Sequence, residues 1–153
     1  MNDCIFRHRL YLFSFLCGLL FIQPALAKEK KNDPPVLAVT ALQCDNAGNP
    51  LGIDTRHPQF SWQIKSTARN VHQAAYQVLV ADATEKLDKA DGNIWNSGKI
   101  ASPQSAGIVY KGNTLDSRKK YYWKVLVWSS ENSTPVTSET ASFEMGLLHQ
   151  QDW

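Results

Sequence analysis

The sequence is poor in cysteine, which limits how the protein can be stabilised. Of its three cysteines, Cys4 and Cys17 lie within the first 27 residues and only Cys44 lies beyond them. A single cysteine cannot form an internal disulfide, so we expect packing to hold the fold together. Cys44 ends an apolar segment, which is typical of a small buried side chain. A nucleophilic cysteine would need a neighbouring base and an electropositive setting.

The sequence also lacks a strong excess of charge. Its 16 Lys and Arg residues and 14 Asp and Glu residues give a formal net charge of +2 at pH 7. Without the first 27 residues, which carry Arg7, Arg9 and Asp3, the charge falls to +1. Nucleic acids and anionic membranes are bound through clusters of positive charge. We therefore expect neither as a partner of the mature protein.

No pattern of catalytic or cofactor-binding residues is present. The chain contains no P-loop, no G-x-G-x-x-G and no G-x-S-x-G sequence. His57, His72 and His149 are far apart and follow no metal-ligand spacing. The densest acidic group alternates with lysines in a polar turn, which is typical of a solvated face; its members are Asp82, Glu85, Asp88 and Asp91. We predict no catalytic residue, no cofactor and no metal ligand.

The N-terminus has the order of a secretory signal peptide. Arg7 and Arg9 precede the apolar run Leu10–Ile22, and the small-residue site Ala25-Leu26-Ala27 follows it. The run is shorter than the roughly 20 residues that span a bilayer. We therefore predict a signal peptide over residues 1–27, a mature start at Lys28, and export to the periplasm or the cell exterior. Residues 28–35 are polar or proline and read as a spacer.

The rest of the chain is a series of short apolar or alternating runs separated by turn residues, which predicts an all-β fold. The runs are Leu37–Cys44, Phe60–Ile64, Tyr76–Ala81, Ile94–Ile100, Ile108–Tyr110, Tyr121–Trp128 and Ala141–Met145. Seven strands are typical of a sandwich of the immunoglobulin or fibronectin type III type. We place this sandwich over residues 36–146, with 147–153 as the start of a linker. A short helix is expected over Thr84–Ala90, capped by Thr84.

The run Tyr121–Trp128 is the clearest strand. By the two-residue period, Tyr121, Trp123, Val125 and Val127 share one face and should point into the core. The opposite face carries Tyr122, Lys124, Leu126 and Trp128, and it is apolar enough to predict that another segment covers part of it. Leu115, six residues before Tyr121, predicts a tyrosine corner. The buried set should be Trp62, Tyr76, Leu115, Tyr121, Trp123 and Val125.

Several aromatic residues exceed what so small a core requires. They are Trp95, Tyr110, Tyr122, Trp128 and Trp153. Aromatic side chains at a domain surface serve either as docking area for a neighbouring domain or as flat platforms for sugar rings. We identify Trp95, Tyr122, Trp128 and Trp153 as candidates for such a docking or sugar-stacking surface.

From about Val39 onward the sequence resembles the N-terminal β-sandwich of bacterial α-L-rhamnosidases. Five motifs in the family's order carry the resemblance: Leu51-Gly52-Ile53-Asp54-Thr55 with Pro58-Gln59-Phe60-Ser61-Trp62; Gln73-Ala74-Ala75-Tyr76-Gln77-Val78-Leu79-Val80-Ala81; Trp95-Asn96-Ser97-Gly98-Lys99 with Gln104-Ser105; Tyr121-Tyr122-Trp123-Lys124-Val125; and Phe143-Glu144-Met145-Gly146-Leu147-Leu148. The family often has a tryptophan before a Ser-Glu pair, where this chain has Thr137 before Ser138-Glu139.

The resemblance implies a non-catalytic module. In the family, the segment from Gly146 to Trp153 leads into further β-sandwiches and an α/α barrel that carries the catalytic carboxylates of an inverting glycosidase. We expect the partners to be the remaining domains of a rhamnosidase polypeptide or split-gene product, with a docking or supporting role. The alternative is a free-standing carbohydrate-binding module that takes rhamnose-containing glycans. Without a neighbour, the apolar tail of Met145, Leu147, Leu148 and Trp153 should be mobile or drive self-association.

Overall fold

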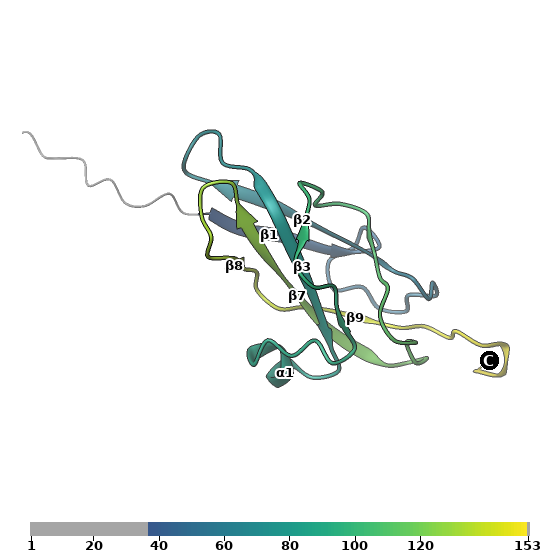
Figure 1. Ribbon diagram of the computed structural model, residues 1–153. Helices are drawn as coiled ribbons and strands as arrows, with labels where there is room; N and C mark the ends of the chain where they lie inside the picture. The colour runs from purple at the N-terminus through teal and green to yellow at the C-terminus, as the bar shows by residue number, and fades with distance from the viewer. Residues whose placement is uncertain (1–36, 153) are drawn as a thin grey trace, which may run out of the picture. The chain divides into compact units, whose positions relative to one another are not determined.

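The computed structural model describes residues 37–152 (Figure 1). The predicted signal peptide, the spacer at 28–35 and Trp153 lie outside the described residues. Within the described part of the chain, no helix has both the length and the apolar character needed to cross a membrane.

The described residues form two antiparallel sheets. The first has three strands in the order β1-β2-β6, and the second has six strands built around the pair β3 and β7. The strands are β1 (Leu37–Cys44), β2 (Gln59–Ser66), β3 (Gln73–Ala81), β4 (Trp95–Asn96), β5 (Ile100–Ala101), β6 (Ile108–Val109), β7 (Lys120–Ser129), β8 (Val136–Thr137) and β9 (Ala141–Glu144). Helices are the short α1 (Thr84–Asp88) and the 3-10 turn η1 (Gln150–Asp152). The predicted all-β sandwich is confirmed.

The predicted seven strands correspond to seven strand positions, two of which are interrupted. β4 and β5 both pair with β3, and β8 and β9 both pair with β7. The prediction of one continuous strand over Ile94–Ile100 is wrong. The hydroxyl of Ser97 accepts a hydrogen bond from the Val78 amide at 2.8 Å, in place of a backbone partner, and Gly98 then turns the chain with φ of +65°. The β8 segment is a short strand that the sequence reading missed.

The core lies between the two sheets. All six residues of the predicted buried set are at most 6% exposed, and Val127 is fully buried with them. Phe60 from β2 has its ring centroid 4.5 Å from that of Trp123 and 5.7 Å from that of Phe143, so it joins the first sheet to the second. Cys44 is also buried, and burial raises the pKa of its thiol far above the usual range. The interpretation of Cys44 as a packed side chain is confirmed.

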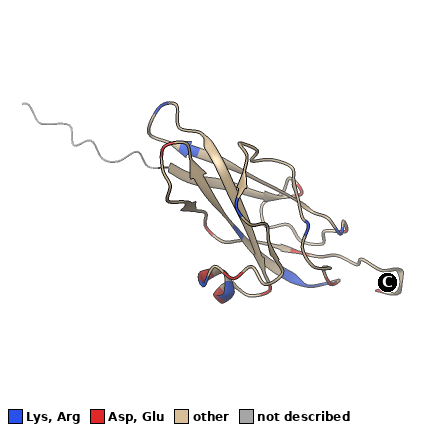
Figure 2. Cartoon of the chain, in the orientation of Figure 1, with Lys and Arg blue, Asp and Glu red and all other residues tan. Residues whose placement is uncertain are grey.

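The outer face of the second sheet is partly covered by α1, as the apolar character of that face predicted. Leu87 from the helix packs with Leu79 and Ala81 of β3, and Tyr122 and Leu126 of β7 adjoin this cluster. The predicted cap is wrong, because Thr84 is the first helical residue and Ala83 occupies the N-cap position without a side-chain capping bond. The helix also ends at Asp88 and not at Ala90. Figure 2 shows that charged residues gather on α1 and the turns, while the sheets are largely uncharged.

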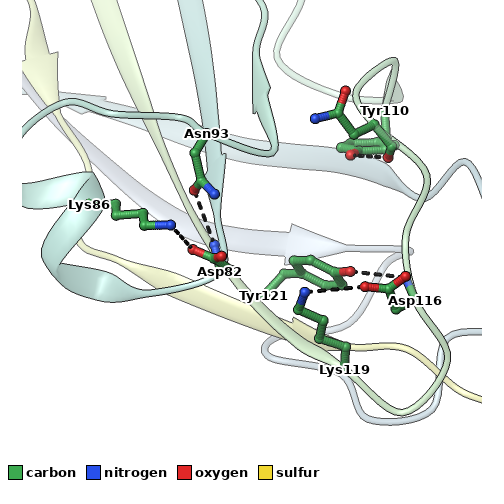
Figure 3. A network of polar contacts seen from close by, with 8 residues as sticks. Asp82, Lys86, Asn93, Tyr110, Asp116, Lys119 and Tyr121 are labelled. Atoms are coloured by element: carbon green, nitrogen blue, oxygen red, sulfur yellow. Dashed lines mark hydrogen bonds and ion pairs between the residues drawn. The ribbon is translucent and has the colours of Figure 1, made fainter.

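The predicted tyrosine corner is present (Figure 3). The backbone amide of Asp116 donates a hydrogen bond of 2.9 Å to the hydroxyl of Tyr121. Tyr121 is 1% exposed and Leu115 is 2% exposed. The corner therefore fixes the loop between Leu115 and β7 to the core.

We predict that Tyr121→Phe lowers the free energy of unfolding by about 0.5–3 kcal/mol, because the hydrogen bond between the Asp116 amide and the hydroxyl of buried Tyr121 is lost. Urea unfolding followed by tryptophan fluorescence measures the change. Tyr122→Phe is the matched control, since the Tyr122 hydroxyl makes no recorded hydrogen bond in residues 37–152 and the substitution should have little effect. Equal effects of the two substitutions would contradict the corner.

Candidate functional site

The candidate aromatic residues do not form one surface. Trp95 lies on β4 opposite Val80, which places it on the inner face of the second sheet. Its ring stacks on that of Phe60 at 6.1 Å and meets the edge of Tyr110 at 5.3 Å. Half-buried Trp95 therefore closes one side of the core, and only the remainder of its ring reaches the surface.

Tyr122 and Trp128 lie on the outer face of β7 but at opposite ends of the strand. Six residues of strand separate them by about 20 Å. Tyr122 adjoins the cluster under α1, and the Lys99 ammonium stands 4.4 Å from the centroid of the Trp128 ring. One ring face of Trp128 is thus taken by a cation. Trp153, the fourth candidate, lies outside the described residues.

Tyr110 is a core residue, although the sequence analysis counted it among the aromatics that exceed the needs of the core. It is 2% exposed, and its hydroxyl donates a hydrogen bond of 2.6 Å to the carbonyl of Asn113. Sequence reasoning missed this because Tyr110 directly follows the two-residue edge strand β6, which is too short for its alternation to indicate burial. Beside Tyr76 and Trp95, a groove of about 250 Å³ runs along the edge of the sandwich, with Ile100 and Val109 at its rim.

The acidic group forms the solvated face that the sequence predicted. Lys86 pairs with Asp82 at 2.8 Å and Lys124 with Asp88 at 3.6 Å. The hydrogen bond from Lys86 is the main cause that holds the pKa of the Asp82 carboxyl below its usual range (Figure 3). Within residues 37–152, no group of three or more histidine, cysteine or acidic side chains is arranged to hold a metal ion.

The most elaborate polar arrangement lies where the chain leaves the last strand. Ile53 and Met145 form an isolated parallel bridge: the Ile53 amide donates to the Glu144 carbonyl at 2.9 Å, and the Gly146 amide donates to the Ile53 carbonyl at 2.6 Å. The prediction that Met145 belongs to an exposed apolar tail is wrong, because Met145 is 1% exposed. Beyond the end of β9 the chain therefore stays paired, through the bridge between Met145 and Ile53. Self-association stays a prediction.

The loop that carries the tyrosine corner also binds residues 148–152, which come after the last strand. The Leu148 amide donates to the Ser117 hydroxyl at 2.9 Å, and this hydroxyl donates to the Asp152 carboxylate. The His149 amide donates to the same carboxylate at 3.0 Å, and the Arg118 guanidinium donates to the Asp152 carbonyl at 2.7 Å. The bond from Ser117 is the main cause that lowers the pKa of Asp152. Asp152 is therefore ionised, and acts as an acceptor, at neutral pH.

A third segment reaches the same place. Arg56 donates to the Leu148 carbonyl at 3.1 Å, and its guanidinium lies 3.0 Å from Nδ1 of His149. Residues 51–56, 115–119 and 145–152 thus meet in one structure, which we call the exit junction. In Figure 1 the final segment (yellow) leaves the sandwich at the end where β7 begins and β9 ends.

Sequence reasoning missed the exit junction as a unit. It identified the stretches 51–55 and 143–148 as separate motifs, and their pairing across more than 90 positions is a backbone contact that no residue type indicates. The available signal was that both stretches contain glycine. A Cβ added to Gly146 would lie 3.1 Å from the Gly52 carbonyl oxygen, and Gly52 has φ of +76°.

The fold and its end segment match a known family. A family model described as the Rha78A-like, N-terminal immunoglobulin domain matches residues 39–149. The chain belongs to this family. The immunoglobulin-domain match covers both sheets and extends through most of the exit junction.

The relatives of this immunoglobulin domain are much longer proteins. An α-L-rhamnosidase of Formosa agariphila is 35% identical over 147 residues, which cover 96% of this chain and 15% of that protein. One of Streptomyces avermitilis is 36% identical over 117 residues, which cover 76% of this chain and 11% of that protein. The larger part of each relative has no counterpart in these 153 residues. These 153 residues carry the N-terminal domain without the catalytic domain.

Solved structures give the same result. The α-L-rhamnosidase from Dictyoglumus thermophilum superposes with a TM-score of 0.72 at 35% identity, covering 76% of this chain and 13% of that one. The Streptomyces avermitilis enzyme, solved with L-rhamnose, has a TM-score of 0.72 at 36% identity, covering 77% of this chain and 11% of that one. The immunoglobulin domain is thus a small part of each enzyme.

Proposed function

We propose that this immunoglobulin domain is a non-catalytic module that docks against and supports the other domains of an exported rhamnoside-degrading enzyme. The partner is the remainder of an α-L-rhamnosidase, in the same polypeptide or as a split-gene product. Export to the periplasm or the cell exterior is part of the proposal and rests on the signal peptide predicted at 1–27.

One observation carries the proposal. The match to an N-terminal domain ends at residue 149, within the segment that the exit junction holds on the sandwich. A module that only had to be tethered would need no such attachment, because a polar linker connects domains without ordering them. Ordering a terminal segment costs conformational entropy. An arrangement that bonds residues 146–152 to two loops favours a fixed position of the next domain.

The alternative, a free-standing carbohydrate-binding module, gains no comparable support. A sugar platform needs an accessible ring face with polar groups around it. Trp95 packs in the core, Lys99 covers one face of Trp128, and Tyr122 lies at the other end of β7. The described candidates therefore favour docking and packing over sugar stacking.

We predict that the chain alone does not hydrolyse an aryl α-L-rhamnoside, because inverting hydrolysis needs two carboxyl groups set about 6.5–9.5 Å apart across a sugar site.

The supporting role of the domain is tested in the Formosa agariphila relative, with its matching stretch replaced by this chain. This chimera should keep rhamnosidase activity to a higher temperature than the same enzyme with the stretch deleted. Release of the aryl group after heating measures both results.

Two outcomes would contradict the proposed function. One is turnover by the short chain that is lost on substitution of one of its carboxylates, for example Asp88→Asn. The other is equal heat resistance of the chimera and the deleted enzyme, because a supporting domain must contribute to the stability of the assembly.

A further inference from the structure

Exposed apolar side chains mark two places on the domain. In residues 37–152 the exposed large apolar residues are Leu51, Ile100 and Val109, at 75%, 37% and 39%. Ile100 and Val109 lie at the rim of the groove along the sandwich edge. Leu51 is the most exposed, and it belongs to the exit junction. Exposing a large apolar side chain to water is unfavourable. Leu51, at the end where the chain leaves the sandwich, is therefore a candidate contact for a neighbouring domain.

The backbone around Leu51 fixes where its side chain stands. The Pro50 carbonyl accepts a hydrogen bond of 3.0 Å from the Glu144 amide, and the following Gly52 lies against Gly146. Leu51 is therefore held between two backbone contacts to the departing strand. Leu147 and Leu148, both half-buried, come directly after that strand. Leu51 and Leu147 thus lie in the segments that meet where the chain leaves the sandwich, and Leu148 packs against the core beside them.

Two guanidinium groups at the same end have unused hydrogen-bonding capacity. Arg56 binds the Leu148 carbonyl and His149, and Arg118 binds the Asp152 carbonyl. Neither forms a salt bridge with a carboxylate among the described residues. A guanidinium has five N–H donors, so each arginine retains donors for the carbonyl or carboxylate groups of a neighbour. Apolar anchors beside arginine donors are the usual composition of a protein interface.

We propose that the exit junction is itself the docking face, with Leu51 as its anchor, and that its occupant is the domain that follows in the longer relatives. This inference rests on the proposed function and adds the face and the residues. The occupant is the next domain because relatives continue far beyond the matched stretch. Covalent linkage at the junction also gives that domain a high effective concentration at this end.

The sandwich-edge groove is the competing face. It lies between β5 and β6, whose outer edges are paired with no other strand of residues 37–152. Among the described residues, no hydrogen bond joins the groove to residues 145–152. Leu51, in contrast, directly follows Pro50, whose carbonyl accepts a hydrogen bond from the Glu144 amide. The two faces occupy separate stretches of sequence, 47–57 and 98–111. Peptides from these stretches can therefore report on each face independently.

Hydrogen–deuterium exchange with mass spectrometry tests the proposal, comparing the short chain with the Formosa agariphila chimera. Peptides covering 47–57 should exchange more slowly in the chimera, while those covering 98–111 should not change. Leu51→Ser in the chimera should abolish the slowing at 47–57. Val109→Ser, the matched control on the other face, should leave it intact. The peptide 145–152 is not decisive, because chain continuation alone can protect it.

Each outcome decides between the claims. Slower exchange at 98–111 alone would overturn the exit junction as docking face and leave the docking function standing. Unchanged exchange at both stretches would overturn both. The chimera is also prepared in the Streptomyces avermitilis rhamnosidase, and rhamnoside hydrolysis shows that each framework has folded. A domain accepted by neither framework would contradict the proposal, since a matching face should dock.

Discussion

Replacing Phe60 with alanine is expected to lower the free energy of unfolding by about 3–5 kcal/mol, among the largest effects of a single substitution in this domain. Phe60 is fully buried, and its ring contacts Trp123, Phe143 and Trp95 from the opposite sheet. Deleting the ring removes the contacts that Phe60 makes with the second sheet and leaves a cavity that the rigid strands cannot close.

Urea unfolding followed by fluorescence measures this loss. Small domains are stable by about 5–15 kcal/mol in total, so Phe60→Ala should remove a large share of the stability. Leu51→Ala is the control, because a side chain that is 75% exposed contributes little burial. That control should be nearly neutral in the short chain. A loss at Phe60 no larger than that at Leu51 would contradict the placement of Phe60 between the sheets.

The long central strands could be predicted from sequence because their physics is local. β7 alternates buried and half-buried residues from Tyr121 to Trp128, so the period of two was sufficient to assign its inner face. The tyrosine corner was predictable from the spacing of Leu115 and Tyr121. Two-residue strands such as β4 and β8 contain a single period that is never repeated, and their existence depends on the partner strand. For these the sequence holds no sufficient local signal.

The candidate site was less predictable than the fold. Counting aromatic residues identified Trp95, Tyr122 and Trp128, but the exposure of each ring depends on what packs against it. Phe60 comes from β2 and Lys99 from the loop between β4 and β5. The exit junction depends on Ser117 and Arg56, common polar residues in turns. Their role follows only from the meeting of three distant segments. Polar residue types in loops do not reveal such a meeting.

Gln73 provides the second large effect, because it is one of the two buried polar or charged residues in the described part of the chain. It is 4% exposed. Its side-chain oxygen accepts the indole N–H of Trp62 at 3.0 Å. Its side-chain nitrogen donates to the carbonyls of Ser102 and Gln104 at 3.0 and 2.6 Å. One amide therefore fastens the loop between β5 and β6 to both β2 and β3.

We predict that Gln73→Leu lowers the free energy of unfolding by about 3 kcal/mol, since leaving buried polar groups without partners costs about 1–3 kcal/mol each. The Trp62 indole N–H, buried with its ring, should account for the largest part; the two carbonyls lie in a loop that water can reach. Gln77→Leu is the matched control on the same strand. Gln77 bonds the exposed Asn96 side chain, and its loss should cost less than about 1 kcal/mol.

A double-mutant cycle separates the indole bond from the rest. In the Trp62→Phe background the indole N–H is gone, so Gln73→Leu should cost clearly less than in the wild type, with a coupling of about 1–2 kcal/mol. Additive effects would mean that Trp62 and Gln73 do not share a bond. Exchange at residues 102–105 should also speed up in Gln73→Leu alone and not in Trp62→Phe, because only the former releases the two carbonyls. The loop beside the sandwich-edge groove is thus held by a core residue.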